Sequence, residues 1–131
     1  MKRGGFTMIE LIFVIVILGI LAAVALPKFI GVSEQAEAGK CKAFVGTLNR
    51  TVLPSLWTNM VLNNEAATTA ITATTIGNQI DVPATCGTAA EFAAAANAGT
   101  TFTKDVGGVT YEVTGTAATK DVSPILVWAK Q

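Results

Sequence analysis

A single carboxylate, Glu10, interrupts an otherwise uncharged apolar run from Phe6 to Leu26. An ionised carboxylate costs about 2.5–3.5 kcal/mol at the centre of a membrane helix, so it needs a partner of opposite charge. The run itself contains no lysine, arginine or histidine. The position of Glu10 therefore predicts ion-pair chemistry in which the cation comes from outside this segment.

The run that carries Glu10 is long enough to cross a membrane as one helix. Its 21 residues would extend roughly 30 Å, which matches the hydrocarbon core of a bilayer. Lys2 and Arg3 precede it and predict a cytoplasmic N-terminus. A secretory signal peptide with a cut near Ala25 is one alternative, but the run is too long and Glu10 does not suit an apolar signal core. An ordinary single-span anchor is the other.

The segment Gly5-Phe6-Thr7-Met8-Ile9-Glu10 resembles the cleavage and methylation motif of type IV prepilins and of type II secretion pseudopilins. The resemblance includes the short basic leader and an apolar run that ends near Pro27. It implies that a prepilin peptidase cuts between Gly5 and Phe6 and methylates the new amine of Phe6. A glycine before the cut would let the backbone approach the peptidase closely, because it has no Cβ.

For Glu10, the resemblance implies pairing with the Phe6 amine of a neighbouring subunit in a filament. A buried ion pair is only weakly stabilising overall, whereas either charge left alone is costly, so this pair would set the register between subunits. Pro27 and Gly19 would let the helix bend or open as subunits pack. The competing interpretation is that Glu10 only snorkels to the membrane surface.

The apolar run predicts a helix over 6–26, with a kink or local opening at Pro27. An amphipathic pattern with spacings of three and four then predicts a helix over 28–60. Its apolar stripe consists of Cys41, Phe44, Val45, Leu48, Val52 and Leu56. Pro54 should bend the last turns, and Asn63-Asn64 should end them.

The rest of the chain is predicted to form a loop region and then a sheet. Residues 63–100 are rich in Ala and Thr and are expected to be a surface loop with one or two short elements, such as a helix from Glu91 to Ala98 capped by Gly99. Residues 101–130 are expected to form strands, with apolar–polar alternation after a Gly107-Gly108 hairpin turn.

The pilin resemblance implies an α+β fold. The first half of a long N-terminal helix would be the transmembrane and filament-core segment, and its second half would pack on a small antiparallel sheet of about three strands. The expected divisions are a leader at 1–5, a transmembrane and assembly helix at 6–27 and a globular pilin domain at 28–131.

Cys41 and Cys86 are the only cysteines. Their domain would lie outside the cytoplasm, where disulfides persist. A bridge would close a loop of ~45 residues and contribute about 3–4 kcal/mol in the chain-entropy model. The alternative is two free thiols, with Cys41 simply part of the apolar stripe.

The composition predicts a protein that is not an enzyme. The 131 residues have a formal net charge of zero and include no histidine, the commonest general base and metal ligand. No catalytic pair, metal cluster, cofactor motif or nucleic-acid site is evident. The triplet Asn49-Arg50-Thr51 fits the N-glycosylation pattern but lies within a predicted helix and is interpreted as chance.

The predicted function is that of a structural subunit of a type IV pilus. The alternatives are a type II secretion pseudopilin and a membrane-anchored binding module that does not polymerise. The resemblance implies as partners other copies of the chain, a prepilin peptidase, membrane lipid, and an inner-membrane assembly platform with its ATPase. The chain would sit in the inner membrane before assembly and in an extracellular pilus afterwards.

Overall fold

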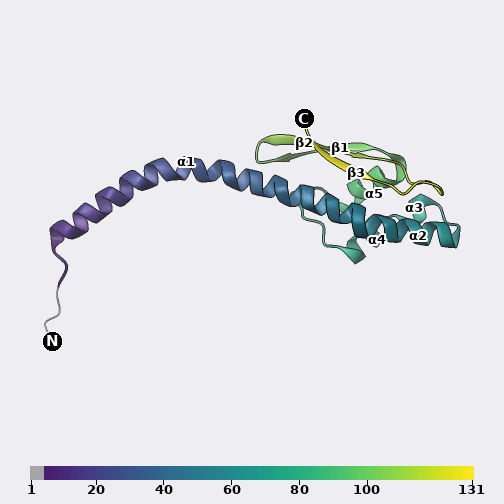
Figure 1. The fold of residues 1–131 in the computed structure, drawn as a ribbon, viewed down its shortest axis with the longest axis horizontal. Helices are drawn as coiled ribbons and strands as arrows, with labels where there is room; N and C mark the ends of the chain where they lie inside the picture. The colour runs from purple at the N-terminus through teal and green to yellow at the C-terminus, as the bar shows by residue number, and fades with distance from the viewer. Residues whose placement is uncertain (1–4) are drawn as a thin grey trace. The chain divides into compact units, whose positions relative to one another are not determined.

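The computed structural model describes residues 5–131, so the predicted leader, including Lys2 and Arg3, lies almost entirely outside the described residues. The chain divides into two compact units after Ser33. This division lies beyond the domain boundary that was expected after Pro27. Figure 1 gives the order of the helices and strands.

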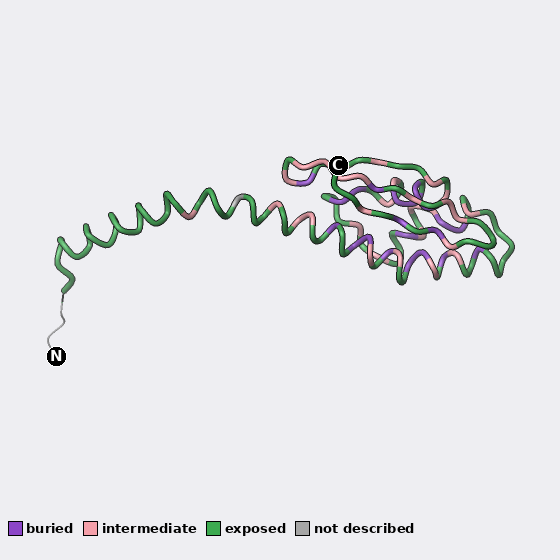
Figure 2. The backbone as a smooth tube through the Cα atoms, turned by 45° about the horizontal axis from the view of Figure 1, so that its top comes forward, coloured by how far each residue is buried: buried purple, intermediate pink, exposed green. Residues whose placement is uncertain are grey.

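The first unit is the N-terminal part of helix α1 (Met8–Thr47). The helix begins two residues later than predicted, because Thr7 caps it from outside. It continues through Pro27 without ending. Nearly all of its described side chains up to Ser33 are exposed (Figure 2), and the large apolar ones from Phe6 to Val32 are each more than 40% exposed. The helical stretch Met8–Asn63 includes a segment apolar and long enough to cross a membrane.

In the second unit the helical path changes register just before Pro54. A π-helical turn, η1 (Leu48–Val52), joins α1 to α2 (Leu53–Asn63). The Leu53 amide donates to the Leu48 carbonyl, five residues back. Proline has no amide hydrogen and cannot donate the regular helical hydrogen bond. The wider π turn accommodates this missing bond just before Pro54, the second residue of α2. The predicted bend is thus realised as a π turn.

The predicted end of the helix and its apolar stripe are both confirmed. Asn64 adopts a left-handed conformation (φ 54°) directly after Asn63, which terminates α2. All six stripe residues are at most 7% exposed: Cys41, Phe44, Val45, Leu48, Val52 and Leu56. The second half of the helix therefore forms one wall of the core.

Residues 63–100, expected to be a surface loop with one or two short elements, contain three short helices and contribute to the core. The segment forms α3 (Ala67–Ala70), α4 (Ala73–Gln79) and α5 (Ala89–Ala98). Ile71, Ile76 and Phe92 within it have no exposed surface. The alanines carry little bulk, but small side chains let backbones approach closely, and three alanines of α5 are buried. The predicted helix ending at Gly99 is confirmed, with Gly99 at φ 67°.

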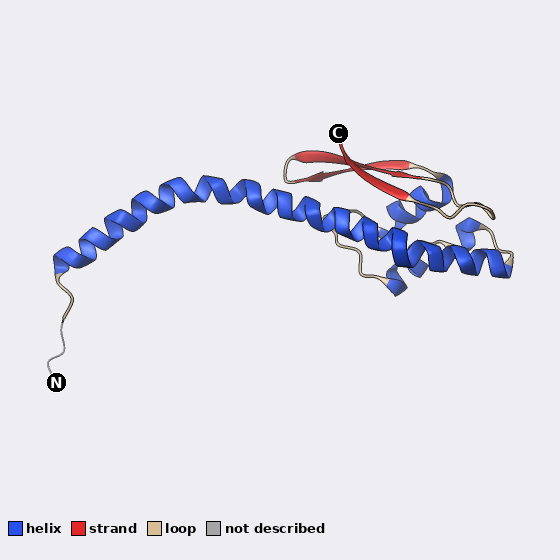
Figure 3. Ribbon diagram, viewed as in Figure 1, coloured by secondary structure: helices blue, strands red, loops and turns tan. Residues whose placement is uncertain are grey.

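Helix α5 lies between the long helix and the sheet (Figure 3). The Phe92 ring of α5 meets Phe44 of α1 at 5.3 Å and Phe102 of the first strand at 5.2 Å, both edge to face. Gly115 allows this close packing, because a Cβ there would collide with the Ala95 carbonyl of α5. Helix α5 thus packs against both the long helix and the sheet.

The predicted three-stranded sheet is confirmed. Strands β1 (Thr101–Val106), β2 (Val109–Gly115) and β3 (Leu126–Lys130) pair antiparallel in the order β1-β2-β3. Gly107 and Gly108 form the two-residue turn between the first two strands, at φ 61° and 76°. Such a turn needs positive φ at both positions, which glycine adopts without strain. The fold is therefore the α+β arrangement that was predicted.

Candidate functional site

The first turn of α1 holds Glu10 through reciprocal hydrogen bonds with Thr7. The Thr7 amide donates to Glu10 Oε2 at 3.2 Å, and the Thr7 hydroxyl donates to the same oxygen at 3.0 Å. The Glu10 amide donates to Thr7 Oγ1 at 3.3 Å. This is a capping box, in which the cap residue and the third helical residue satisfy each other's amides.

The capping box gives Glu10 a structural role within its own chain. The carboxylate sits at the N-terminal end of a helix, where the aligned peptide dipoles favour negative charge. Sequence reasoning weighed only pairing between subunits and snorkelling. The spacing Thr-x-x-Glu before an apolar run is itself the sequence signature of a capping box and could have revealed this contact.

Gly5 and Phe6 lie directly before the capping box. The Phe6 side chain is 83% exposed. A Cβ added to Gly5 would meet no other atom within 4 Å. Packing within the chain therefore does not require a glycine at this position. The structure brings Phe6 and Glu10 to the same end of α1, whereas Pro27 lies farther along that helix.

The two cysteines are joined. Cys41 Sγ and Cys86 Sγ form a disulfide with an S–S distance of 2.06 Å, and both residues have no exposed surface. The bridge ties the segment between α4 and α5 to α1. The predicted disulfide is therefore present in the structure, and it lies in the core of the second unit.

Asn49 has a structural role that sequence reasoning missed. Its side-chain Nδ2 donates to the Leu126 carbonyl at 2.7 Å, and its Oδ1 accepts from the Leu126 amide at 2.9 Å. Both bonds join the π turn to the first residue of β3. No local sequence pattern indicates this contact, because the two residues are 77 positions apart. The Asn49 side-chain amide, the group that would carry a glycan in the triplet Asn49-Arg50-Thr51, is therefore hydrogen-bonded to Leu126.

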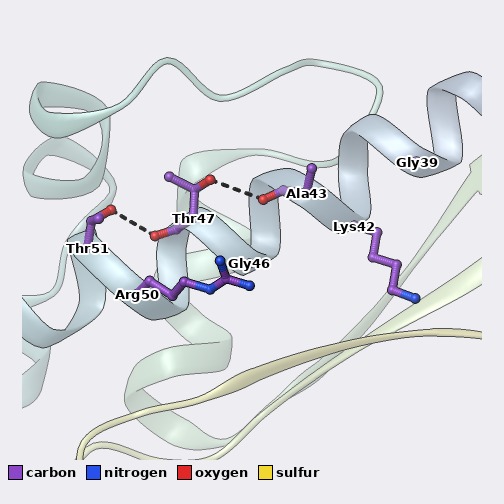
Figure 4. Close-up of a pocket in the computed structure, with 7 residues that line it drawn as sticks. All are labelled: Gly39, Lys42, Ala43, Gly46, Thr47, Arg50 and Thr51. Atoms are coloured by element: carbon purple, nitrogen blue, oxygen red, sulfur yellow. Dashed lines mark hydrogen bonds between the residues drawn. The ribbon is translucent and has the colours of Figure 1, made fainter.

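A shallow hollow follows one face of the long helix in the second unit (Figure 4). Its lining residues are Gly39, Lys42, Ala43, Gly46, Thr47, Arg50 and Thr51. The hydroxyls of Thr47 and Thr51 donate back to carbonyls of their own helix, at 3.1 and 2.8 Å. The hollow therefore offers two cationic side chains, and its lining contains no carboxylate or histidine that could act as a general base.

Within residues 5–131, no three His, Cys, Asp or Glu side chains gather where they could hold a metal ion. Asp105 instead accepts a hydrogen bond from the Thr110 hydroxyl at 2.6 Å, across the β1–β2 hairpin.

Known proteins resemble this chain most clearly at its N-terminal end. The family described as "Prokaryotic N-terminal methylation motif" matches residues 1–26. The "Type IV narrow pilus major component PilA5" of Thermus thermophilus is 49% identical over 43 residues, which are 33% of this chain. The "Type IV major fimbrial protein FimA" of Dichelobacter nodosus is 32% identical over 100 residues, or 76% of this chain. The motif match and the similarity to these two proteins both support the resemblance to type IV pilins that the N-terminal sequence indicates.

The similarity of this chain to these relatives is partial in length. The matches cover 37% of PilA5 and 61% of FimA, so the chain spans less than two thirds of either relative. No solved structure matches the chain significantly. The likeness to type IV pilins therefore consists of the N-terminal motif and of a similarity to FimA that extends over 100 residues.

Proposed function

We propose that this chain is a type IV pilin, a structural subunit of a type IV pilus that polymerises through its N-terminal helix. The observation that carries the proposal is the exposed apolar part of α1. It has Glu10 in its first turn and follows the exposed Gly5-Phe6 pair. Exposed apolar surface of this extent needs cover from lipid or from other helices. The membrane provides that cover before assembly, and neighbouring copies of the helix provide it in the filament.

Processing occurs between Gly5 and Phe6 in this proposal. A prepilin peptidase removes residues 1–5 and methylates the amine of Phe6. The open space around Gly5 supports the idea that the need for glycine comes from the peptidase. The new amine provides the cation that Glu10 of a neighbouring subunit needs in a low-dielectric filament core.

The proposed partners are other copies of the chain, the peptidase, membrane lipid, and an assembly platform with an ATPase. The chain occupies the inner membrane first and an extracellular pilus later, and it performs no catalysis of its own. The names of both relatives describe pilus or fimbrial components, which favours this function over a type II secretion pseudopilin.

The intact mass of the subunit in filaments sheared from cells tests the proposal. A mass that corresponds to residues 6–131 with one added methyl group and one disulfide is expected. Filaments whose subunits retain residues 1–5, or sheared fractions that lack the chain entirely, would contradict it.

A further inference from the structure

We infer that the open edge of strand β3 pairs with β3 of a second copy of this chain, antiparallel and centred on Ala129. The strand is the last in the sheet order, so within residues 5–131 one of its edges has no neighbouring strand. An unpaired strand edge is a template for the addition of another strand. The inference concerns the second unit alone and does not rest on the proposed function.

The backbone groups on the open edge belong to alternate residues of β3. The Thr116 amide donates to the Ile125 carbonyl at 2.8 Å, and the Gln131 amide donates to the Thr110 carbonyl at 3.1 Å. Odd-numbered residues of this strand therefore bond to β2, because the direction of the bonds alternates along a strand. The even-numbered residues turn their amides and carbonyls to the open edge: Leu126, Trp128 and Lys130.

Asn49 already occupies the first of these three positions. Its side chain donates to the Leu126 carbonyl at 2.7 Å and accepts from the Leu126 amide at 2.9 Å. A neighbouring strand would form the same pair of bonds at Leu126. The part of the edge that remains open to a second strand therefore consists of Trp128 and Lys130.

The residues of the open part favour one antiparallel register between two copies. A two-fold pair centred on Ala129 sets Trp128 of each copy opposite Lys130 of the other. A pair centred on Trp128 would need the backbone groups of Leu126 that Asn49 already binds. A pair centred on Lys130 would set two lysines directly opposite each other, which is unfavourable. The register centred on Ala129 avoids both conflicts.

This register also places complementary side chains together on both faces of the sheet. A lysine on an edge strand usually discourages pairing, but here the Lys130 ammonium meets Trp128 of the second copy in a cation–π contact. Trp128 retains exposed surface for that contact although its ring stacks on Tyr111. On the opposite face, Ile125 and Val127 are 54% and 55% exposed, and the second copy covers part of this apolar strip.

The test introduces a cysteine at the centre of the contact, in the detergent-solubilised full chain. Residue 129 would face its own copy in a non-hydrogen-bonded pair, with Cα atoms about 4.5 Å apart, which suits a disulfide. Ala129→Cys should therefore form a disulfide-linked dimer under mild oxidation. The exposed Thr103 lies on the other edge strand, β1, and Thr103→Cys should give about tenfold less dimer. Both native cysteines are already paired, so the new thiol is the one that reacts.

Substitutions of Lys130 in the Ala129→Cys chain show whether the contact is strand pairing. Lys130→Pro removes an amide that points to the open edge and leaves the bonds between β2 and β3 in place. It should lower the dimer yield about tenfold, because each copy loses one donor of the new contact. Lys130→Arg keeps the amide and the charge, so its yield should stay within about twofold of the parent.

Two results would overturn the inference. One is a dimer yield from Ala129→Cys no greater than that from Thr103→Cys. The other is an undiminished yield when Lys130→Pro is added, which would mean that the two copies meet without pairing their strands. Tryptophan fluorescence of each variant verifies that the second unit is folded, and the comparison of Ala129→Cys with Thr103→Cys decides the matter without the proline variant.

Discussion

At the scale of single residues, Glu10 shows how one carboxylate can serve two states of a protein. In the isolated subunit it caps its own helix through Thr7. In the proposed filament it also meets the amine of another copy. The two roles are compatible because the helix end already favours negative charge. The residue that looks most out of place in the apolar sequence is thus accommodated before any partner arrives.

Substitution of Gly5 should separate the demands of the peptidase from those of the fold. Gly5→Leu should abolish leader removal, because a bulky side chain blocks close approach of the backbone to the peptidase. Gly5→Ala should still be cut, at a lower rate. Immunoblots that resolve full-length from cut chain measure this, and the thermal unfolding of both variants should match the wild type because the position touches nothing. Efficient cutting of Gly5→Leu would contradict this account of the processing site.

Substitution of Asn49 should show the value of its two bonds to Leu126. Asn49→Leu should lower the free energy of unfolding by roughly 2–3 kcal/mol, since it leaves the amide and carbonyl at the start of β3 without partners. Denaturant unfolding of the detergent-solubilised chain, followed by tryptophan fluorescence, measures the loss. Asn49→Asp is the matched control, because it keeps an acceptor for the Leu126 amide and should cost less. Equal stability of Asn49→Leu and the wild type would refute the role of this contact.

At the scale of elements, the sequence predicted those whose patterns are local. The alternation after Gly107-Gly108 predicted the first two strands, and the spacing of three and four predicted the buried stripe of the helix. The π turn at Leu48–Val52 was missed because a single proline is compatible with several helical distortions. Helices α3 and α4 were missed because they are short, and their stability comes from packing that the local sequence does not reveal.

The Ala/Thr-rich region is an instructive case. Low bulk was taken to indicate exposure, yet Ala95 and Ala96 have no exposed surface. Two threonine caps, at Thr72 and Thr88, start the helices of this region. They match the Ser/Thr cap preference that could have predicted α4 and improved the start of α5.

The disulfide should support the short helices of this region more than the helix to which it binds them. Cys86→Ser, or the Cys41→Ser and Cys86→Ser pair, should lower the free energy of unfolding by about 2–4 kcal/mol, because the unfolded chain is no longer constrained by the loop. Thermal unfolding with and without reductant measures the change. Membrane insertion should be unaffected, since neither cysteine lies in the apolar segment 6–26 of α1. Wild-type stability of the variants, or alkylation of both thiols in folded protein without reductant, would contradict the prediction.

At the scale of the whole molecule, the two units differ in whether their apolar side chains are covered. The first unit exposes large apolar side chains along α1, and the second unit encloses its own core. A chain of this kind needs lipid or other copies around its first unit only.

Removal of the proposed leader would change the net charge of the chain. The leader carries Lys2 and Arg3, so the cut chain keeps seven basic and nine acidic side chains, which gives a net charge of −2.

The role of Glu10 in assembly is tested by the partition of cut chain between sheared filaments and membranes, compared for the wild type and Glu10→Gln. We expect Glu10→Gln to insert and lose its leader normally but to yield less than about one tenth of the wild-type filament, since a buried amine without its counter-charge costs a few kcal/mol per subunit contact. A wild-type filament yield from Glu10→Gln, with filaments of normal length, would contradict the claim that this carboxylate directs assembly.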